Sequence, residues 1–478
     1  MTELIFASAQ ALARHIVTRE VSSSEVLDAH LAQIARHNPT LNAIVTLDEE
    51  GARTRARQAD EALARGEPWG PLHGLPMTLK DGLSTGGLRT TAGFPPLADY
   101  IPERDGTVAA RLKSAGAIII GKTNVPVLLS QPQTDNPIFG RTNNPWDLSR
   151  TPGGSSGGAC AAVASGMVPL EIGSDLAGSI RIPSHFCGVF GLKPTARRVP
   201  QTGHIPDLPG ASRFDRWCGV SGPIARSVDD LALALCVIVG PDGQDTEIPP
   251  VQGLNLPPVS LPPVSLHELR VAWAPTFPGV PVAASIQDTV QRVATGLDQC
   301  GAAVEQALPD LDFTWQHDIW ALYYRLLDHA WIRMTGTTDT EGPEPGPGMM
   351  DLVGFLAQRD ALIHAWEQFF SAWDVLLCPA APVTAFPHCP PGTPLLVDGR
   401  SIDAGQISHH AYPFSLTGHP TVTLPASHDR DGLPVGVQLV GHRWNDERLL
   451  AIAGCVADIT GTFRRPPGYD RQGQECGA

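Results

Sequence analysis

The 478-residue chain lacks the features of a membrane or exported protein. No uninterrupted apolar run approaches the roughly 20 residues that a membrane-spanning helix needs. The N-terminal segment Met1 to Ala7 has neither the basic start nor the long apolar stretch of a secretory signal. We therefore predict a cytoplasmic protein that has no membrane partner.

Positive charge is also scarce. The sequence has 34 Lys and Arg residues against 49 Asp and Glu residues, which gives a formal net charge of −15 at pH 7. A surface with this balance repels the phosphates of nucleic acids and of anionic lipids. No nucleic acid is therefore expected as a partner.

The patterns that indicate disulfides or metal sites are absent. None of the nine cysteines stands in a C-x-x-C pair, and their odd number favours a reducing compartment. Five have apolar neighbours and are expected to be small buried residues: Cys160, Cys187, Cys236, Cys378 and Cys455. The motif H-E-x-x-H is missing, and adjacent His409 and His410 point different ways on a helix or a strand. We expect no metal and no other cofactor.

The residues that are present fit a globular protein with a large core, since 42% are hydrophobic and 17% are charged. Ser22 to Glu25 form a capping box before an amphipathic helix, and Glu49 to Arg65 read as a second helix. Strands are predicted at residues 75–80, 117–120, 168–172, 271–274, 303–306, 375–378, 421–424 and 435–440. Further helices are predicted at 108–115, 158–165, 227–239, 285–299, 315–334, 352–373 and 447–459, and the proline-rich residues 251–263 as an extended connection. The alternation predicts an α/β protein in which helices cover both faces of a large mixed β-sheet, within one domain.

Residues Gly116 to Thr123 match the P-loop pattern of nucleotide-binding proteins. A P-loop is a flexible turn that follows a strand, whereas the intervening residues here are Ala-Ile-Ile-Ile and a helix-like segment precedes them. We interpret the segment as a buried strand that ends in a turn.

Residues Gly153 to Gly157 match G-x-S-x-G, the nucleophile elbow of α/β-hydrolases. That elbow requires an apolar strand directly before it. The preceding segment, Asn143 to Pro152, is polar and contains two prolines, so it disfavours an elbow at Ser155.

Lys80, Ser155 and Ser179 offer a different catalytic set. Lys80 ends an apolar strand-like segment, where burial would lower the pKa of its amine toward that of a useful base. Ser155 lies in a glycine loop that permits unusual backbone geometry such as a cis peptide. Ser179 follows a turn whose backbone N–H groups can form an oxyanion hole. From the residues alone, a surface lysine and two turn serines are the commoner explanation.

Several ordered motifs resemble the amidase signature family. They run from about Leu72 to Pro200 and return near the C-terminus, and they include Gly74-Leu75-Pro76, Gly140 to Trp146, Thr151 to Gly158, Gly173 to Arg181, Gly188 to Thr195, Leu416 to Pro420 and Gly432 to Gly441. The resemblance implies the amidase signature fold over residues 1–478. Within it we expect N-terminal helices at 1–66, core motifs at 67–200, a divergent specificity region at 201–412 and the C-terminal part of the core at 413–478.

The resemblance also implies a hydrolase that cleaves the C–N bonds of carboxamides through a Ser-cisSer-Lys triad. Lys80 would be the base, Ser155 the bridging cis-serine and Ser179 the nucleophile that forms an acyl-enzyme. The implied oxyanion hole consists of the amides of Leu176, Ala177 and Gly178, with that of Ser179. The implied supporting residues are Ser156 and the pair Asp175 and Arg181. The family usually has glycine at the position of Ala177, so the added methyl is expected to narrow the pocket or restrict the turn.

The substrate implied by the resemblance is a small-molecule amide or carbamate, and aryl amides and esters belong to the same chemistry. The alternative is the amidase subunit of an amidotransferase complex. The segment Gln131 to Asn136 looks more like free-standing amidases, for which we expect a monomer or homodimer. The candidate pocket residues are Leu128, Leu129, Gln131, Trp320, Tyr323 and Tyr324, although such side chains more often pack in a core. The Gly/Pro-rich residues 341–348 are expected to border the entrance as a flap.

Overall fold

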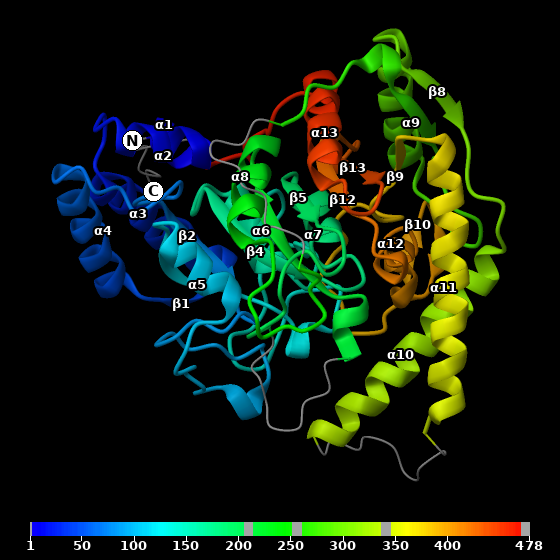
Figure 1. Cartoon of the computed structure of the whole chain (residues 1–478), viewed down its shortest axis with the longest axis horizontal. Helices are drawn as coiled ribbons and strands as arrows, with labels where there is room; N and C mark the ends of the chain where they lie inside the picture. Colours follow the sequence, from blue (N-terminus) through cyan, green and yellow to red (C-terminus); the bar gives the residue numbers. More distant parts are fainter. Residues whose placement is uncertain (1, 205–213, 251–260, 336–345, 470–478) are drawn as a thin grey trace.

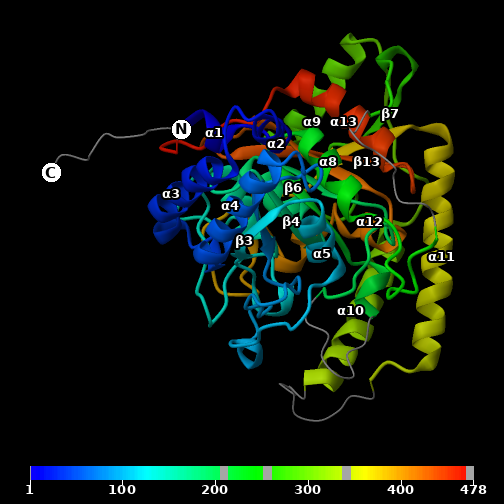
Figure 2. The same ribbon diagram turned by 60° about the vertical axis from the view of Figure 1, so that its left-hand side comes forward.

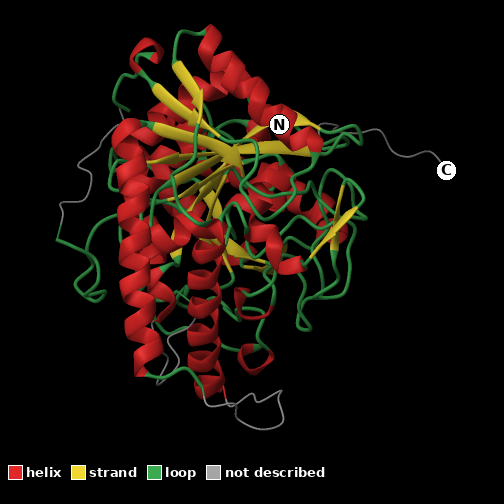
Figure 3. Cartoon of the chain, turned by 90° about the vertical axis from the view of Figure 1, so that its right-hand side faces the viewer, coloured by secondary structure: helices red, strands yellow, loops and turns green. Residues whose placement is uncertain are grey.

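A mixed β-sheet of 11 strands runs through the computed structural model, which describes residues 2–204, 214–250, 261–335 and 346–469. The strands lie side by side in the order β1-β3-β2-β4-β6-β5-β12-β13-β9-β7-β8 and fan out as a twisted sheet (Figures 1 and 3). Their bounds are β1 (Ile44–Leu47), β2 (Pro76–Lys80), β3 (Ile118–Thr123), β4 (Leu170–Asp175), β5 (Phe190–Lys193), β6 (Val220–Ala225), β7 (Arg270–Trp273), β8 (Ala303–Gln306), β9 (Val375–Pro379), β12 (Thr421–His428) and β13 (Pro434–Gly441). A separate antiparallel pair is formed by β10 (Leu395–Val397) and β11 (Arg400–Ile402).

Two parallel parts of this sheet flank an antiparallel middle. Strand β2 runs parallel to β3 and to β4, and β7 runs parallel to β8 and to β9. The register places Thr78 of β2 opposite Glu171 of β4. The carboxyl ends of β2 and β4, which carry Lys80 and Asp175, therefore meet at one edge of the sheet, where open α/β sheets commonly bind ligands.

Helices cover both faces of the sheet (Figure 2). They are α1 (Thr2–Phe6), α2 (Ala9–Val17), α3 (Ser23–Leu41), α4 (Glu49–Ala64), α5 (Thr107–Ser114), α6 (Gly157–Ala164), α7 (Arg181–Cys187), α8 (Val228–Ile238), α9 (Ala284–Gln299), α10 (Phe313–Thr335), α11 (Met349–Ala372), α12 (Tyr412–Thr417) and α13 (Asp446–Thr460). The two faces can be followed along β13, because successive strand side chains point to opposite sides. Val437 and Leu439 pack in the core with α8, α9 and α13, whereas Gln438 contacts α7 and Val440 packs with α10 to α12.

Helices α10 and α11 lie side by side and enclose an aromatic core (Figure 3). The fully buried Trp366 is its centre: the ring lies 5.0 Å from the ring of Phe414, and its indole nitrogen donates to Gln316 Oε1 at 3.0 Å. This packing fixes α10 against the sheet and thereby places Tyr324 and Leu327 of that helix at the wall of a cavity.

The sequence predictions agree with most of these elements. The capping box at Ser22 is present, because its side chain accepts from the Glu25 amide and the Glu25 carboxylate accepts from the Ser22 amide. The P-loop-like segment is a strand, as we interpreted it, and its Lys122 is buried with its amine donating to Leu83 O and Thr85 Oγ1. None of the described helices is long and apolar enough to cross a membrane.

Several predictions need correction. The strand expected at 168–172 begins at Leu170 and continues to Asp175, and the strand expected at 117–120 continues to Thr123, because polar residues at the ends of these strands pair with buried partners. Strands β1, β5 and β6 were not predicted. Cys236 and Cys455 are only half-buried, since each lies on a helix near its solvent side. Residues 251–260 and 341–345 of the predicted connection and flap lie outside the described residues.

Candidate active site

The three residues of the predicted catalytic set come from three separate segments. Lys80 is the last residue of β2, Ser155 lies just before α6, and Ser179 lies between β4 and α7. The Lys80 amine donates to Ser155 Oγ at 2.8 Å and to the carbonyl oxygen of Ser174 at 3.1 Å. Both Lys80 and Ser155 are buried, which removes water as a competing hydrogen-bond partner.

Ser155 and Ser179 line the same cavity, whose volume is about 190 Å³. Their segments are joined by a hydrogen bond from the Ser156 amide to the Ser179 carbonyl oxygen, 3.0 Å long. The Gly154–Ser155 peptide bond is cis. Ser179 is half-buried, whereas Lys80 and Ser155 are buried, so Ser179 is the most accessible of the three residues.

The glycines of this loop allow its close approach to neighbouring backbone. Gly153 has φ +86°, and a Cβ atom there would lie 2.9 Å from Pro183 Cα. A Cβ atom on Gly154 would lie 2.5 Å from the carbonyl oxygen of Gln131. A side chain at either position therefore requires the backbone to shift, so the loop needs glycine for a steric reason.

A buried ion pair holds the loop that carries Ser179. The Arg181 guanidinium donates to both oxygens of Asp175, at 2.7 and 3.0 Å, and to the Ala411 carbonyl oxygen at 2.6 Å. Both side chains are fully buried. Burial opposes ionisation of Asp175, but the charge and hydrogen bonds of Arg181 prevail and hold the pKa of this carboxyl group well below its usual value.

Asp175 also limits the set of backbone amides in this loop that are available to bind an oxyanion. The Gly178 amide donates to Asp175 Oδ1 at 2.9 Å and therefore points to the ion pair. The amides of Leu176, Ala177 and Ser179 have no hydrogen-bond partner among the residues that the structure describes. Ala177 does not have the positive φ that favours glycine, so its methyl group imposes no strain on the turn.

Burial lowers the pKa of the Lys80 amine from 10.5 to about 7, because the charged form is poorly solvated there. The carboxylates of Asp175 and Glu171 act in the opposite direction and limit this shift. At neutral pH a large fraction of Lys80 is thus an uncharged amine that can accept a proton.

Sequence reasoning missed the buried Glu171 of β4. Its carboxylate accepts from the hydroxyl groups of Thr78 and Thr123, the latter at 3.0 Å, and burial raises its pKa to about 8. It lies on the same face of the sheet as Lys80, because Thr78 and Lys80 are two residues apart on β2. The signal in the sequence was an acidic residue inside an otherwise apolar strand segment.

The cavity wall contains three of the six candidate pocket residues. Leu128, Leu129 and Tyr324 line it, and the two leucines have positive φ angles of 49° and 59°. Gln131, Trp320 and Tyr323 are not among its lining residues; Trp320 and Tyr323 stack on each other in the aromatic core. The lining residues that sequence reasoning missed come from segments far apart along the chain; they include His204, Asp215, Leu327 and Asp328.

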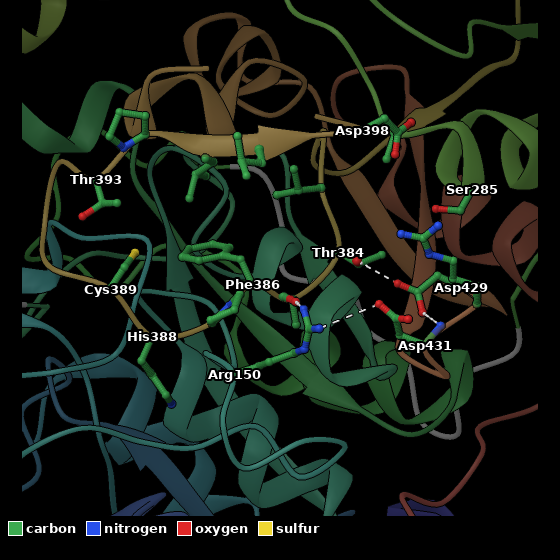
Figure 4. Close-up of a pocket in the computed structure, with 18 of the residues that line it drawn as sticks. Arg150, Ser285, Thr384, Phe386, His388, Cys389, Thr393, Asp398, Asp429 and Asp431 are labelled. Carbon is green, nitrogen blue, oxygen red and sulfur yellow. Dashed lines mark hydrogen bonds and ion pairs between the residues drawn. The ribbon is translucent and has the colours of Figure 1, made fainter. Parts of the chain in front are cut away.

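A second cavity, of about 490 Å³, lies where the start of α9 meets residues 383–398 and 429–431 (Figure 4). Among its lining residues, Arg150 lies 3.8 Å from Asp431, and the Thr384 hydroxyl group donates to Asp429 at 2.8 Å. None of the predicted catalytic residues lines this cavity, so the candidate active site is the smaller one. Within the described ranges no group of three His, Cys, Asp or Glu residues is arranged to hold a metal ion.

Comparison with known proteins agrees with this architecture. A family model described as Amidase matches residues 25–344 and 354–450. An acylamidase from Rhodococcus erythropolis is 35% identical over 95% of this chain and 96% of that protein. A glutamyl-tRNA(Gln) amidotransferase subunit from Geobacillus thermodenitrificans is 34% identical over 94% of this chain and 96% of that protein. The crystal structure of a bacterial aryl acylamidase of the amidase signature family matches with a TM-score of 0.83 at 26% identity, over 95% of this chain and 96% of that one.

The mixed sheet and these matches define an enzyme that hydrolyses C–N bonds. The chain belongs to the amidase signature family.

Proposed function

We propose that this protein hydrolyses small carboxamides through Lys80, Ser155 and Ser179. The observation that carries the proposal is the 2.8 Å hydrogen bond from the Lys80 amine to Ser155 Oγ, in a buried site where the pKa of Lys80 is lowered to about 7. Ser155 and Ser179 line one cavity, so a proton can pass from the reachable serine to the buried base. The similarity to an acylamidase supports an acyl amide as the substrate class.

The reaction starts with Lys80 uncharged. Lys80 accepts the proton of Ser155, and Ser155 accepts that of Ser179 as Ser179 Oγ attacks the carbonyl carbon. The tetrahedral intermediate collapses, the C–N bond breaks, and the proton returns through Ser155 to the leaving amine. A water molecule then attacks the acyl-enzyme and passes its proton along the same route, which releases the acid and restores Ser179.

The oxyanion of the tetrahedral intermediate requires hydrogen-bond donors in place before the reaction. We assign this role to the amides of Leu176, Ala177 and Ser179, which have no partner among the described residues. The amide of Gly178 is left out because it donates to Asp175. The ion pair of Asp175 with Arg181 holds the loop that carries Ser179, and we give it no part in the chemistry.

We propose carbamates, aryl amides and esters as further substrates of the same site. Each presents a carbonyl carbon bonded to a leaving nitrogen or oxygen, and each passes through the same tetrahedral intermediate. The cavity is lined partly by leucines and a tyrosine, which suit an apolar substituent on either side of that carbonyl group.

Membership of an amidotransferase complex is the second candidate function. It is favoured by the 34% identity to a glutamyl-tRNA(Gln) amidotransferase subunit over 94% of this chain. In that case the amidase site would act within a complex, and the purified chain would show little activity.

The test is an assay of the purified chain, alone, on acyl anilides and on matched carbamates. We expect release of the aniline, and a loss of about 10³-fold or more in kcat for Ser179→Ala, because the nucleophile is removed. The control is Ser130→Ala, another cavity serine, whose hydroxyl donates to the Val127 carbonyl oxygen at 2.9 Å. Activity that survives Ser179→Ala refutes the assignment of the nucleophile, and no activity without a partner protein favours the amidotransferase.

A further inference from the structure

The cavity that contains Ser179 carries negative charge that the proposed chemistry does not use. Of the three carboxylates that line it, Asp175 is neutralised by Arg181, whereas Asp215 and Asp328 have no lysine or arginine partner among the described residues, and Asp215 lies near His204. No lysine or arginine is found among the described residues that line it. Arg216, next to Asp215 in the chain, pairs instead with Asp245 at 3.0 Å.

Asp215 lies close to the nucleophile loop. It precedes β6, whose first residue, Val220, is paired with Asp175 at the end of β4. Between them, a Cβ atom on Gly219 would be only 3.7 Å from the Leu176 side chain. The Asp215 side chain is 19% exposed, so its carboxylate is largely removed from bulk water but still available in the cavity.

Asp328 lies on α10, the helix whose Tyr323 hydroxyl donates to the Asp215 carbonyl oxygen at 3.5 Å. Tyr324, Leu327 and Asp328 are spaced i, i+3 and i+4 and therefore share one face of the helix, and all three line the cavity. Tyr324 and Leu327 provide an apolar surface, and Asp328 is exposed at its edge.

His204 is an independent sign of a missing polar partner. Its side chain is only 8% exposed and lines the cavity, yet neither ring nitrogen has a hydrogen-bond partner among the described residues. Its Nδ1 lies 3.8 Å from Asp215 Oδ2, which is longer than a hydrogen bond. Buried polar groups are usually paired, so this ring is available to a polar group or a water molecule in the cavity. A ring nitrogen that carries no hydrogen has a lone pair that can accept a hydrogen bond from such a group.

We propose that the substrate has an apolar body that ends in a protonated amine, and that Asp215 and His204 bind this ammonium group while Asp328 attracts it at the cavity edge. The inference rests on the proposed amide hydrolysis and names the substrate class of that site. An ammonium group has three N–H donors, which matches the acceptors on Asp215 and His204, and it compensates the excess negative charge.

The test compares two pairs of substrates in which an ammonium group replaces a methyl group of equal size. The first pair, hexanoyl and 5-aminopentanoyl 4-nitroanilide, places the charge on the acyl side. The second, the hexanoyl amides of 4-ethylaniline and 4-(aminomethyl)aniline, places it on the amine side. At pH 8 both amines are protonated, since aliphatic amines have a pKa of about 10.

We expect kcat/KM to be about tenfold higher for the charged member of at least one pair, which corresponds to about 1.4 kcal/mol. The preference should fall with added salt and should disappear in Asp215→Asn, with a smaller loss in Asp328→Asn, because that residue is more exposed. The matched control is Asp360→Asn, which removes an exposed carboxylate of α11 that does not line the cavity. Circular dichroism of each variant verifies that it folds.

The outcomes separate this inference from the function on which it rests. Hydrolysis that depends on Ser179 but shows no preference for the charged member of either pair overturns the ammonium site alone. A preference that persists unchanged in both Asp215→Asn and Asp328→Asn also overturns it. If none of the four amides is hydrolysed, or if hydrolysis survives Ser179→Ala, the proposed function fails and this inference fails with it.

Discussion

The pH dependence of activity tests whether burial makes Lys80 a base. With a pKa of about 7, the neutral fraction of Lys80 is about one-tenth at pH 6, half at pH 7 and nine-tenths at pH 8. Because only the neutral amine accepts a proton, kcat/KM should rise about tenfold from pH 6 to pH 8 and then level off. An exposed lysine with the ordinary pKa of 10.5 would instead give a rate that still increases above pH 9.

The substitution Glu171→Gln tests how much the charge of this carboxylate contributes to the pKa of Lys80. The Glu171 carboxylate raises the pKa of Lys80 when it is charged, but burial raises the pKa of Glu171 itself to about 8, so most of it is protonated over the acid limb. Its removal should therefore move the acid limb only slightly, and to lower pH. The side chain keeps its size, and the hydroxyl groups of Thr78 and Thr123 can rotate to pair with an amide. Glu305→Gln removes an exposed carboxylate from β8 and is the control.

The assay is a series of kcat/KM measurements from pH 5 to pH 9.5 on a neutral acyl anilide, for the wild type and both variants. The acid limb of kcat/KM reports ionisation of the free enzyme. A wild-type midpoint above pH 9 would refute the argument that burial depresses the pKa of Lys80. A midpoint that moves to higher pH in Glu171→Gln would refute the role given to the carboxylate.

Three further outcomes follow from the packing around the site. Arg181→Leu leaves the Asp175 carboxylate buried without a partner and should lower the free energy of unfolding by about 3–5 kcal/mol in urea titrations; a loss below about 1 kcal/mol would contradict the ion-pair argument. Gly153→Ala should destabilise the protein more than Gly432→Ala, measured by thermal unfolding, because both have φ near +80° but only Gly153 faces close backbone; equal losses would show that the steric contact is unimportant. Ala177→Gly should change kcat by less than about threefold, since the Ala177 backbone is unstrained, and a larger gain would show that the methyl group obstructs the oxyanion.

Local signals in the sequence were sufficient for much of the fold. The Ser22 capping box and the 3.6-residue periodicity behind it fix the start of α3, and the apolar segment before Lys80 predicts β2. Strands β5 and β6 were missed because glycine, proline and polar residues interrupt the apolar runs that predict buried strands, in the sequences Phe-Gly-Leu-Lys and Val-Ser-Gly-Pro-Ile-Ala. The ends of β3 and β4 were misplaced because their polar residues are paired in the fold: Thr123 donates to Glu171, and Asp175 pairs with Arg181.

For the site, the sequence by itself determined the residues that we propose for the chemistry: the lysine that ends an apolar strand, and the glycine-bracketed serines Ser155 and Ser179. Only the tertiary structure decided that Lys80 is dehydrated and bonded to Ser155, and that the Gly178 amide serves Asp175. The same holds for the cavity, whose walls come from segments more than a hundred residues apart. The physical reason is that periodicity and turn propensity act over a few neighbouring residues, whereas burial, pKa and charge in a cavity depend on which distant segments pack together.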